Sequence, residues 1–382
     1  MFMSVISQMD QKTRKEVIEK NIDVSLKNIG NVFCDDEKNV HCENLIGAIS
    51  IPLGVAGPLL INQSSSKFGR TTVQIEKLIP IATTEGALVA SINRGCKVIN
   101  EAGGISTYIE QVGVTRGVIF RTKGINESEK VKKWFNVNFN EISEVARSSS
   151  SHLKLNEIDA QSIGRSLYVR FSFDTDQAMG MNMATIAADK IASFINEKKN
   201  IKVLAVAGNY DTDKKPSWLN MIKGRGRKIS SEIIISNQIV SKNLHTNPKR
   251  IVEVVKHKCW GGSILSGSLG FNAQYANIVA GVFLATGQDS AHIVEGSLGI
   301  TSADVLDDGS LYFSVYLPDI LLGVVGGGTK LKTQTEARAL AKVLTSDDLA
   351  ELLAGAVLAG ELSLIASIAE NSLASAHKKL GR

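Results

Sequence analysis

Glu85 is the first of four ionisable side chains whose local contexts could support acid–base chemistry. It follows Thr83 and Thr84 at the start of a predicted helix, where the helix dipole favours a charged carboxylate. To donate a proton near neutral pH, Glu85 would need burial or a neighbouring anion to oppose that effect. A first-turn acid is also common on helices without any chemical role, so position alone leaves both interpretations open.

The other three are Lys214, Asp289 and His377. Lys214 lies in a charge-dense segment (211–216) that indicates either a solvated loop or a segment clamped between two domains. Asp289 follows an apolar helix, and the dipole disfavours a carboxylate there unless a cation pairs with it. His377 is predicted in the last turn of a C-terminal helix, which favours the imidazolium and suits a general acid. The alternative for Asp289 is an ordinary acid in a loop, and the alternative for His377 is an exposed histidine in the C-terminal tail.

Two glycine-bearing turns and one basic run could bind phosphate groups. The turns are 178–182 and 326–330, and neither matches a P-loop or a GxGxxG sequence after a strand. The basic run, 223–228, indicates a solvated loop, an anion-binding loop or, least favoured, a nucleic-acid contact. Nucleic-acid binders usually cluster basic residues into a longer stripe, which this chain lacks.

The bulk composition describes an ordinary folded protein. A length of 382 residues predicts two or three domains. The chain is 43% hydrophobic and 21% charged, with a net charge of +5. Four cysteines without a CxxC pair argue against zinc and favour a reducing compartment, and Cys96 is predicted to pack in the core. The apolar stretch 352–364 is interrupted by Glu361, and the first residues do not resemble a targeting signal. The sequence therefore predicts a cytoplasmic protein without a membrane segment or a metal.

The elements needed to position these residues can be outlined from periodicity. Alternation or apolar runs predict strands near 73–76, 118–121, 167–173, 202–206, 233–236 and 311–315. Helical spacing predicts helices near 17–24, from 83 to about 102, over 127–147 and over 179–196, with a loop at 148–151. The strands and helices between 117 and 205 form a small α+β unit within an otherwise mostly helical chain.

Many segments, taken together, resemble the catalytic region of the 3-hydroxy-3-methylglutaryl-CoA (HMG-CoA) reductases. They occur in family order from about residue 40 to the C-terminus and are closer to the eukaryotic and archaeal class. The matching segments are ENLIG (43–47), IPLGVAGPL (51–59), ATTEGALVASINRGC (82–96), VTRG (114–117), AMGMNM (178–183), GNYDTDKKP (208–216), GRGRK (224–228), NAQYANIV (272–279), GQD (287–289), VGGGT (325–329) and AGELSL (359–364).

The resemblance implies an α+β fold in which a small ferredoxin-like cofactor domain is inserted into a large domain. An N-terminal helical segment would span 1–52, and the large CoA- and substrate-binding domain 53–116 and 217–382. The inserted NAD(P)-binding domain would span 117–205, and a catalytic loop, 206–216, would connect the two. A homodimer or larger oligomer, with sites at the subunit interface, is also implied.

The resemblance also implies a reaction and its residues. HMG-CoA would be reduced to mevalonate by two NADPH, or NADH, molecules. Lys214 would stabilise the oxyanion, Asp289 would hold Lys214 and couple to Glu85, Glu85 would protonate the mevaldehyde oxygen, and His377 would protonate the CoA thiolate. Implied substrate contacts are Asn93, Arg94, Arg116, Asp213, Lys215, Lys258 and Asn277. Implied cofactor contacts are Ala178, Met179, Gly180, Met181, Asn182, Gly326 and Arg382.

Three positions depart from the family pattern. Gln177 stands where an aspartate is usual, and Ala207 replaces a serine. Near Ser151 the arginine that often pairs with the 2′-phosphate of NADP is missing, although Lys154 is close. These departures leave the choice between NADPH and NADH open. They also motivate an alternative hypothesis, a non-catalytic protein that binds CoA thioesters.

Overall fold

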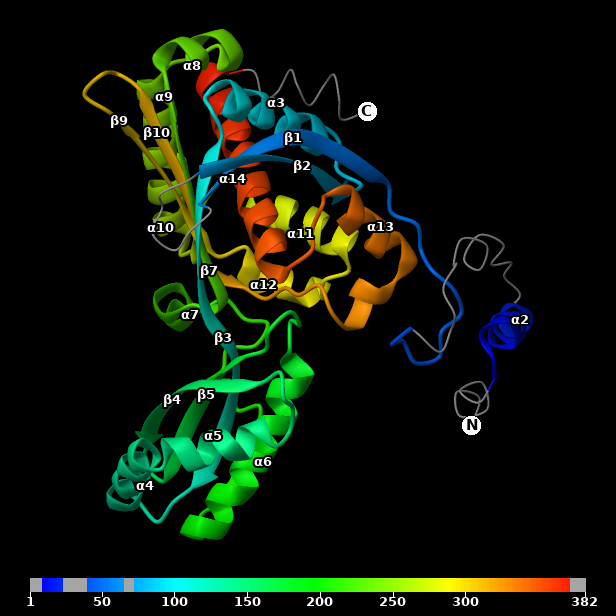
Figure 1. The fold of residues 1–382 in the computed structure, drawn as a ribbon, viewed down its shortest axis with the longest axis vertical. Coiled ribbons are helices and arrows are strands. Elements are labelled where there is room, and N and C mark those ends of the chain that lie inside the picture. The colour runs from blue at the N-terminus through cyan, green and yellow to red at the C-terminus, as the bar shows by residue number, and fades with distance from the viewer. Residues whose placement is uncertain (1–8, 23–39, 65–71, 372–382) are drawn as a thin grey trace.

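The structure is a computed structural model that describes residues 9–22, 40–64 and 72–371. Helix α2 (Gln11–Ile22) confirms the helix predicted near the N-terminus. The predicted residues His377 and Arg382 lie outside the described residues. The chain is a mixed α/β protein in which a large upper part and a smaller lower part share one long strand, β3 (Ile105–Arg121) (Figure 1).

Strand β3 takes part in two sheets. Its first half pairs with β7 on one side and briefly with β1 on the other, and its second half, from Val114 onward, pairs with β5 and β6. In the large part the strand order is β2-β1-β3-β7-β10-β9-β8. The bounds of these strands are β1 (Leu53–Ser64), β2 (Thr72–Ala82), β7 (Arg225–Ile235), β8 (Gly270–Phe271), β9 (Gly299–Val305) and β10 (Leu311–Ile320).

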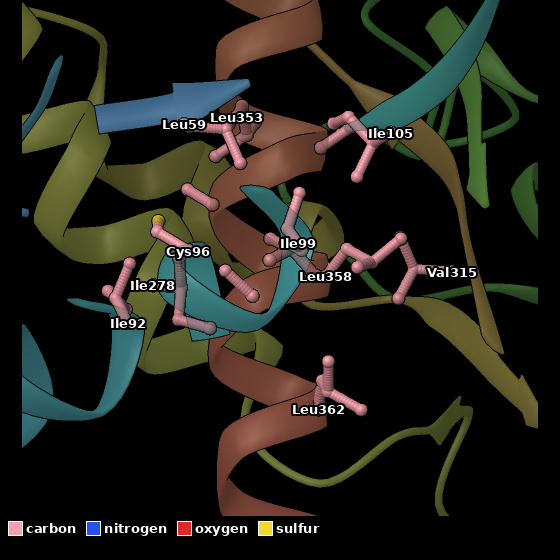
Figure 2. Packing of buried hydrophobic residues seen from close by; sticks show 14 of the residues in the cluster. Leu59, Ile92, Cys96, Ile99, Ile105, Ile278, Val315, Leu353, Leu358 and Leu362 are labelled. Atoms are coloured by element: carbon pink, nitrogen blue, oxygen red, sulfur yellow. The ribbon is translucent and has the colours of Figure 1, made fainter. Parts of the chain in front are cut away.

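The core of the large part surrounds helix α14 (Ser346–Glu370). Leu353, Leu358 and Leu362 of this helix pack among buried side chains of the sheet and of helices α3 (Leu88–Glu101) and α11 (Tyr275–Thr286) (Figure 2). The remaining helices are α7 (Trp218–Lys223), α8 (Asn237–Leu244), α9 (Pro248–Val254), a π-helix (Val255–Gly262), α10 (Ser263–Ser266), a 3₁₀ turn (Ser290–His292), α12 (Ile293–Gly296), a 3₁₀ turn (Gly327–Lys330) and α13 (Lys332–Leu340).

Helix α14 is more continuous than the sequence predicts. By length and composition it could cross a membrane, but 89% of its most apolar window is buried inside the protein, as in a core helix. Glu361 does not interrupt it, because its carboxylate accepts hydrogen bonds from the backbone of Ala273 and Gln274 and from the hydroxyl of Thr301. Burial raises the pKa of Glu361 despite these donors. Paired in this way, a charged residue fits in the middle of an apolar helix.

The small part is a four-stranded antiparallel sheet with helices packed on it. Its strand order is β4-β5-β3-β6, and its core contains phenylalanines such as Phe120, Phe171 and Phe173. The strands predicted at 167–173 and 202–206 are confirmed. The bounds are α4 (Ile125–Val137), α5 (Phe139–Arg147), β4 (Lys154–Ile163), β5 (Ser166–Asp174), α6 (Met181–Lys199) and β6 (Lys202–Val206).

Two predicted helices differ in detail. The helix predicted over 127–147 is two helices, because the chain leaves helical geometry at Asn138, whose side chain donates to the carbonyl of Trp134. The helix predicted to open at Thr83 or Thr84 begins at Leu88, after Ala87 in a left-handed conformation (φ 70°). Glu85 therefore lies in the turn before α3 rather than in its first turn, so the predicted dipole effect does not apply as stated.

The crossing of α3 and α14 depends on a glycine. A Cβ on Gly95 would lie 2.0 Å from the carbonyl oxygen of Ala359, so the two backbones approach too closely for any side chain. We expect Gly95→Ala to destabilise the protein by roughly 1–3 kcal/mol in urea unfolding, because overpacking outweighs the helix propensity gained. Lys97→Ala, on the exposed side of the same helix, should change stability by less than about 0.5 kcal/mol. Equal stability of the two variants would contradict this explanation of the contact.

Candidate active site

The segment between β6 and α7 carries Lys214 in an unusual backbone conformation. Ala207, Asn209, Thr212 and Lys214 all have positive φ, at 78°, 62°, 57° and 55°. Non-glycine residues rarely adopt this conformation, and it persists only where surrounding contacts impose it. Thr212 contributes one such contact, because its hydroxyl bonds the side chain of buried Asn220 at 2.5 Å. The interpretation of 211–216 as a clamped segment is therefore closer to the structure than a freely solvated loop.

Lys214 and Asp289 are brought together from segments far apart in sequence. The Lys214 ammonium (Nζ) lies 3.0 Å from Oδ2 of Asp289, and both side chains are about two-fifths exposed, at 43% and 37%. Burial works against the charged form of Asp289. The hydrogen bond from the Ala291 N–H, the Lys214 ammonium and nearby His292 outweigh it, and the pKa of Asp289 is lowered.

The predicted setting of Asp289 needs a correction. Helix α11 ends at Thr286 with Gly287 as its left-handed C-cap. Asp289 instead caps the N-terminus of the next turn, Ser290–His292, and accepts a 3.0 Å hydrogen bond from the N–H of Ala291. An N-cap favours a carboxylate, so the dipole helps Asp289 rather than opposing it.

A buried network of charged side chains contacts this pair, and the sequence analysis did not predict most of its members. Arg225 is fully buried and donates to Asp213 at 2.9 Å and to Glu295 at 2.9 Å. Glu295 also accepts from the backbone N–H of Lys214 at 3.1 Å and contacts Nδ1 of His292 at 2.6 Å. A ring nitrogen of His292 and one carboxylate oxygen each of Asp213 and Glu295 lie within 4.8 Å of one another, close enough to suggest a cation site, but the guanidinium of Arg225 already supplies positive charge there.

Arg225 belongs to the basic run 223–228. The sequence favoured a solvated loop or an anion-binding loop for this run, and neither interpretation describes the structure. Lys223 pairs with Asp159, Arg227 with Asp347 at 2.8 Å and Lys228 with Glu110 at 3.0 Å. Arg225 and Arg227 point into the protein from strand β7. Every basic side chain of the run has an acidic partner, so the run is neither a solvated loop nor a free anion-binding loop.

A further buried acid borders the network. Asp319 on β10 is fully buried, and burial raises its pKa to about 8 although Arg225 acts in the opposite direction. One of its oxygens accepts from the amide of Asn220, and the other has no hydrogen-bond partner among the described residues. The network beside the Lys214 segment thus includes an acid whose neutral form is favoured by burial.

Arg116, predicted to contact substrate, is held by protein groups. Its guanidinium lies 3.1 Å from Asp211 and 3.7 Å from Asp213, and it also donates to the hydroxyl of Thr185. Lys215, in contrast, is exposed, and its ammonium reaches only the backbone carbonyl of Asp213 at 3.4 Å.

Glu85 lies in a second cluster, lining a cavity of about 380 Å³ with Arg94, Lys258 and Asn277. The amide of Asn277 donates to Glu85 at 3.3 Å. Within residues 72–371, no hydrogen bond or ion pair joins Glu85 to Lys214 or to Asp289. Arg94 bonds the hydroxyl of Ser363 on α14 at 3.0 Å, and burial lowers its pKa.

Two other predicted substrate residues differ in their settings. Asn93 is exposed, but its side-chain oxygen accepts from the backbone N–H of Gly57 at 3.0 Å, which gives it a structural contact. Lys258 lies on the π-helix and borders both the Glu85 cavity and an adjoining open cleft of about 1010 Å³. A π-helix often marks a functional site, and the sequence carried no signal for it.

Five of the predicted cofactor residues, 178–182, lie against the glycine-rich segment after β10. Ala178 forms a bridge with Val325, next to Gly326. A Cβ on Gly323 would lie 2.3 Å from the backbone nitrogen of Met179, so glycine is required for this close approach. Gly180 caps the N-terminus of α6, Met181 is buried and Asn182 is exposed.

Gln177, the departure from the family pattern, has a structural role here. Its side-chain oxygen accepts from the backbone N–H of Ser346 at 2.8 Å, at the start of α14. It therefore ties the predicted cofactor turn to the central helix of the large part.

Comparisons with known proteins agree with this architecture. The family model described as hydroxymethylglutaryl-coenzyme A reductase matches residues 10–382. The 3-hydroxy-3-methylglutaryl-coenzyme A reductase of Methanocaldococcus jannaschii is 48% identical over 98% of this chain and 94% of its own length. That of Pyrococcus abyssi is 45% identical over 97% and 92%. A reductase of the plant Hevea brasiliensis is 39% identical over 89% of this chain and 60% of its own length.

Solved structures share the fold. A 3-hydroxy-3-methylglutaryl-coenzyme A reductase of Streptococcus pneumoniae superposes with a TM-score of 0.71 at 16% identity, over 95% of this chain and 98% of that one. Another structure of that organism's enzyme, described as class II and bound to NADPH, gives a TM-score of 0.70. Identity is much higher with the archaeal and plant relatives, as the sequence predicts. The chain belongs to the hydroxymethylglutaryl-coenzyme A reductase family.

Proposed function

We propose that this chain catalyses the reductive deacylation of HMG-CoA to mevalonate and CoA, with two NADPH molecules as reductant. The observation that carries the proposal is the Lys214–Asp289 pair at 3.0 Å, held on a backbone segment of rare conformation in a chain of this family. A fixed ammonium is what two successive hydride additions to carbonyl carbons require, because each addition places negative charge on oxygen.

The roles proposed for the four catalytic residues are those that the family resemblance implies, and they meet this requirement. Lys214 stabilises the oxyanion, and ionised Asp289 orients Lys214 and is coupled to Glu85. Glu85, oriented by Asn277, delivers a proton to the mevaldehyde oxygen. His377 protonates the departing thiolate of CoA.

The turn 178–182 fits a dinucleotide. NADPH, when bound, supplies the hydride for each step. Gly323 and Gly180 remove side-chain bulk near the turn, and the N-terminus of α6 offers backbone N–H groups and a favourable dipole to a pyrophosphate. Ala178, Met179, Met181, Asn182, Gly326 and Arg382 complete the proposed cofactor contacts.

The acyl-CoA group would be held by the substrate residues of the resemblance. Lys258 supports this assignment, because it lines both the Glu85 cavity and the adjoining cleft, where a long ligand could extend. Arg94 and Asn93 would contact CoA. Arg116, Asp213, Lys215 and Asn277 would surround the hydroxymethylglutaryl group, and binding would require Arg116 to exchange an acidic partner for the substrate carboxylate.

The inserted domain is proposed to be ferredoxin-like and to span 117–205. Support comes from the chain order β3-α4-α5-β4-β5-α6-β6 and the antiparallel sheet order β4-β5-β3-β6, which is the split βαβ arrangement with one helix broken in two. The segments 53–116 and 217–382 would form the large domain, 206–216 the connecting catalytic loop and 1–52 the N-terminal segment.

A homodimer or larger oligomer, acting in the cytoplasm, completes the proposal. Its support is that Glu85 contacts Asn277 and Lys214 contacts Asp289, while no hydrogen bond or ion pair joins the two pairs among the described residues. A second subunit could bring complementary sets together. The partners would be HMG-CoA and NADPH or NADH, and neither a nucleic acid nor a membrane.

Purified protein is expected to oxidise two NADPH molecules for each CoA released from HMG-CoA. The measurement follows reductant absorbance and free thiol in the same reaction, with NADPH and NADH side by side. Binding of CoA without turnover of either reductant would instead support a non-catalytic CoA-thioester-binding protein.

A further inference from the structure

His292 and Glu295 form a buried pair next to Lys214 and Asp289. Their side chains are 1% and 0% exposed, and they come from one short segment that follows α11. No role in the reaction described above uses them. A histidine and a glutamate placed entirely out of water are costly unless they are fully paired, so their partners are informative.

Glu295 fixes the backbone at Lys214. Its Oε1 atom accepts from the Lys214 N–H at 3.1 Å, from Arg225 at 2.9 Å and contacts His292 at 2.6 Å. Lys214 has φ 55°, a conformation that a lysine adopts only when contacts impose it. The hydrogen bond to Glu295 is such a contact, and it sets where the Lys214 side chain leaves the segment.

His292 links Glu295 to Asp289. Its Nδ1 faces Glu295 at 2.6 Å, while Nε2 lies 3.6 Å from Asp289, too far for a hydrogen bond, and has no hydrogen-bond partner among the described residues. The other charged groups around this ring and Glu295 are Asp213 and Lys214 on the 207–217 segment, Arg225 on β7 and Asp319 on β10.

We propose that Glu295 and His292 are positioning residues of the active site. Glu295 holds Lys214 through its backbone, and the buried His292 ring, which lies between Glu295 and Asp289, limits where the two carboxylates can lie. Together they position both members of the Lys214–Asp289 pair from the buried side of the site, although neither touches substrate. This inference rests on the proposed function, since it assigns support for that reaction's oxyanion-stabilising group.

Two substitutions of Glu295 separate positioning from simple stability. Glu295→Ala removes the acceptor for the Lys214 N–H, and we expect kcat to fall by about 10²-fold with the KM for HMG-CoA unchanged, because a small misplacement of a reacting group has an effect of this size. Glu295→Gln keeps an acceptor oxygen and should retain most of kcat. Glu351→Gln, a buried glutamate on α14 that pairs with Lys77 and Gln63, is the matched control and should keep wild-type kcat.

His292→Gln tests the ring between the carboxylates, because a glutamine side chain does not reproduce the shape of the ring at that place. We expect a lower kcat with the KM for HMG-CoA unchanged, whereas Glu351→Gln keeps both constants at wild-type values. All variants are compared by thermal unfolding, and kcat is expressed per folded enzyme.

The outcomes distinguish this inference from the proposed function. Wild-type protein that does not reduce HMG-CoA would reject the function itself. Active wild type with equal kcat in Glu295→Ala, Glu295→Gln and Glu351→Gln would overturn the role of Glu295. A wild-type kcat in His292→Gln would overturn the role of His292.

Discussion

Replacing Lys214 by alanine is expected to lower kcat by about 10²–10³-fold, the range observed when an oxyanion-stabilising donor is removed. The substitution takes away the ammonium that lies 3.0 Å from Asp289. The fall in kcat should exceed any rise in the KM for HMG-CoA, because the interaction strengthens as charge develops on oxygen. Steady-state kinetics with saturating NADPH measures both constants.

Lys242→Ala is the matched control for Lys214. Lys242 also pairs with an acid, Glu101, but on the exposed surface of helix α8. It should leave kcat and KM at wild-type values. If Lys214→Ala behaved like Lys242→Ala, the assignment of Lys214 as the oxyanion-stabilising group would be wrong.

Replacing Arg225 by leucine is expected to destabilise the protein by about 3–5 kcal/mol in the free energy of unfolding. Arg225 is 0% exposed and donates to Asp213, to Glu295 and to the hydroxyl of Thr115. Leucine fills part of the space but leaves two carboxylates without their shared cation. Urea unfolding monitored by circular dichroism gives the change.

Arg250→Ala provides the comparison for Arg225. Arg250 pairs with Glu253 at 3.2 Å, with both side chains about half exposed. Exposed pairs of this kind contribute at most about 1 kcal/mol. Similar losses for the two arginines would show that burial of the network contributes nothing beyond an ordinary surface ion pair.

Secondary structure was predictable wherever its signal is local. The alternating run at 167–173 and the helix at 179–196 correspond closely to β5 and α6, because one buried face leaves a period in the sequence. The full length of β3 was not predictable. Its first half at 105–113 pairs in one sheet and its second half in another, and those partners come from segments more than forty residues away.

The candidate site was predictable only in part. Resemblance pointed to Lys214 and Asp289, and the structure places them in contact. Glu295 and His292 were missed because a single glutamate and a single histidine after an apolar helix carry no periodic signal. The sequence analysis placed Arg225 in a basic run that it interpreted as a loop. In the structure Arg225 is the first residue of strand β7, and the alternation of buried side chains along that strand includes it.

The sequence by itself determined the family resemblance, the types of residue available for chemistry and most of the local helices and strands. It could do so because these depend on residue identity and on spacing over a few positions. Tertiary structure alone decided which charges are paired and removed from water. Arg225 meets Thr115 and Glu295 across 110 and 70 residues of chain, and the charge environment of Lys214 follows from such long-range contacts.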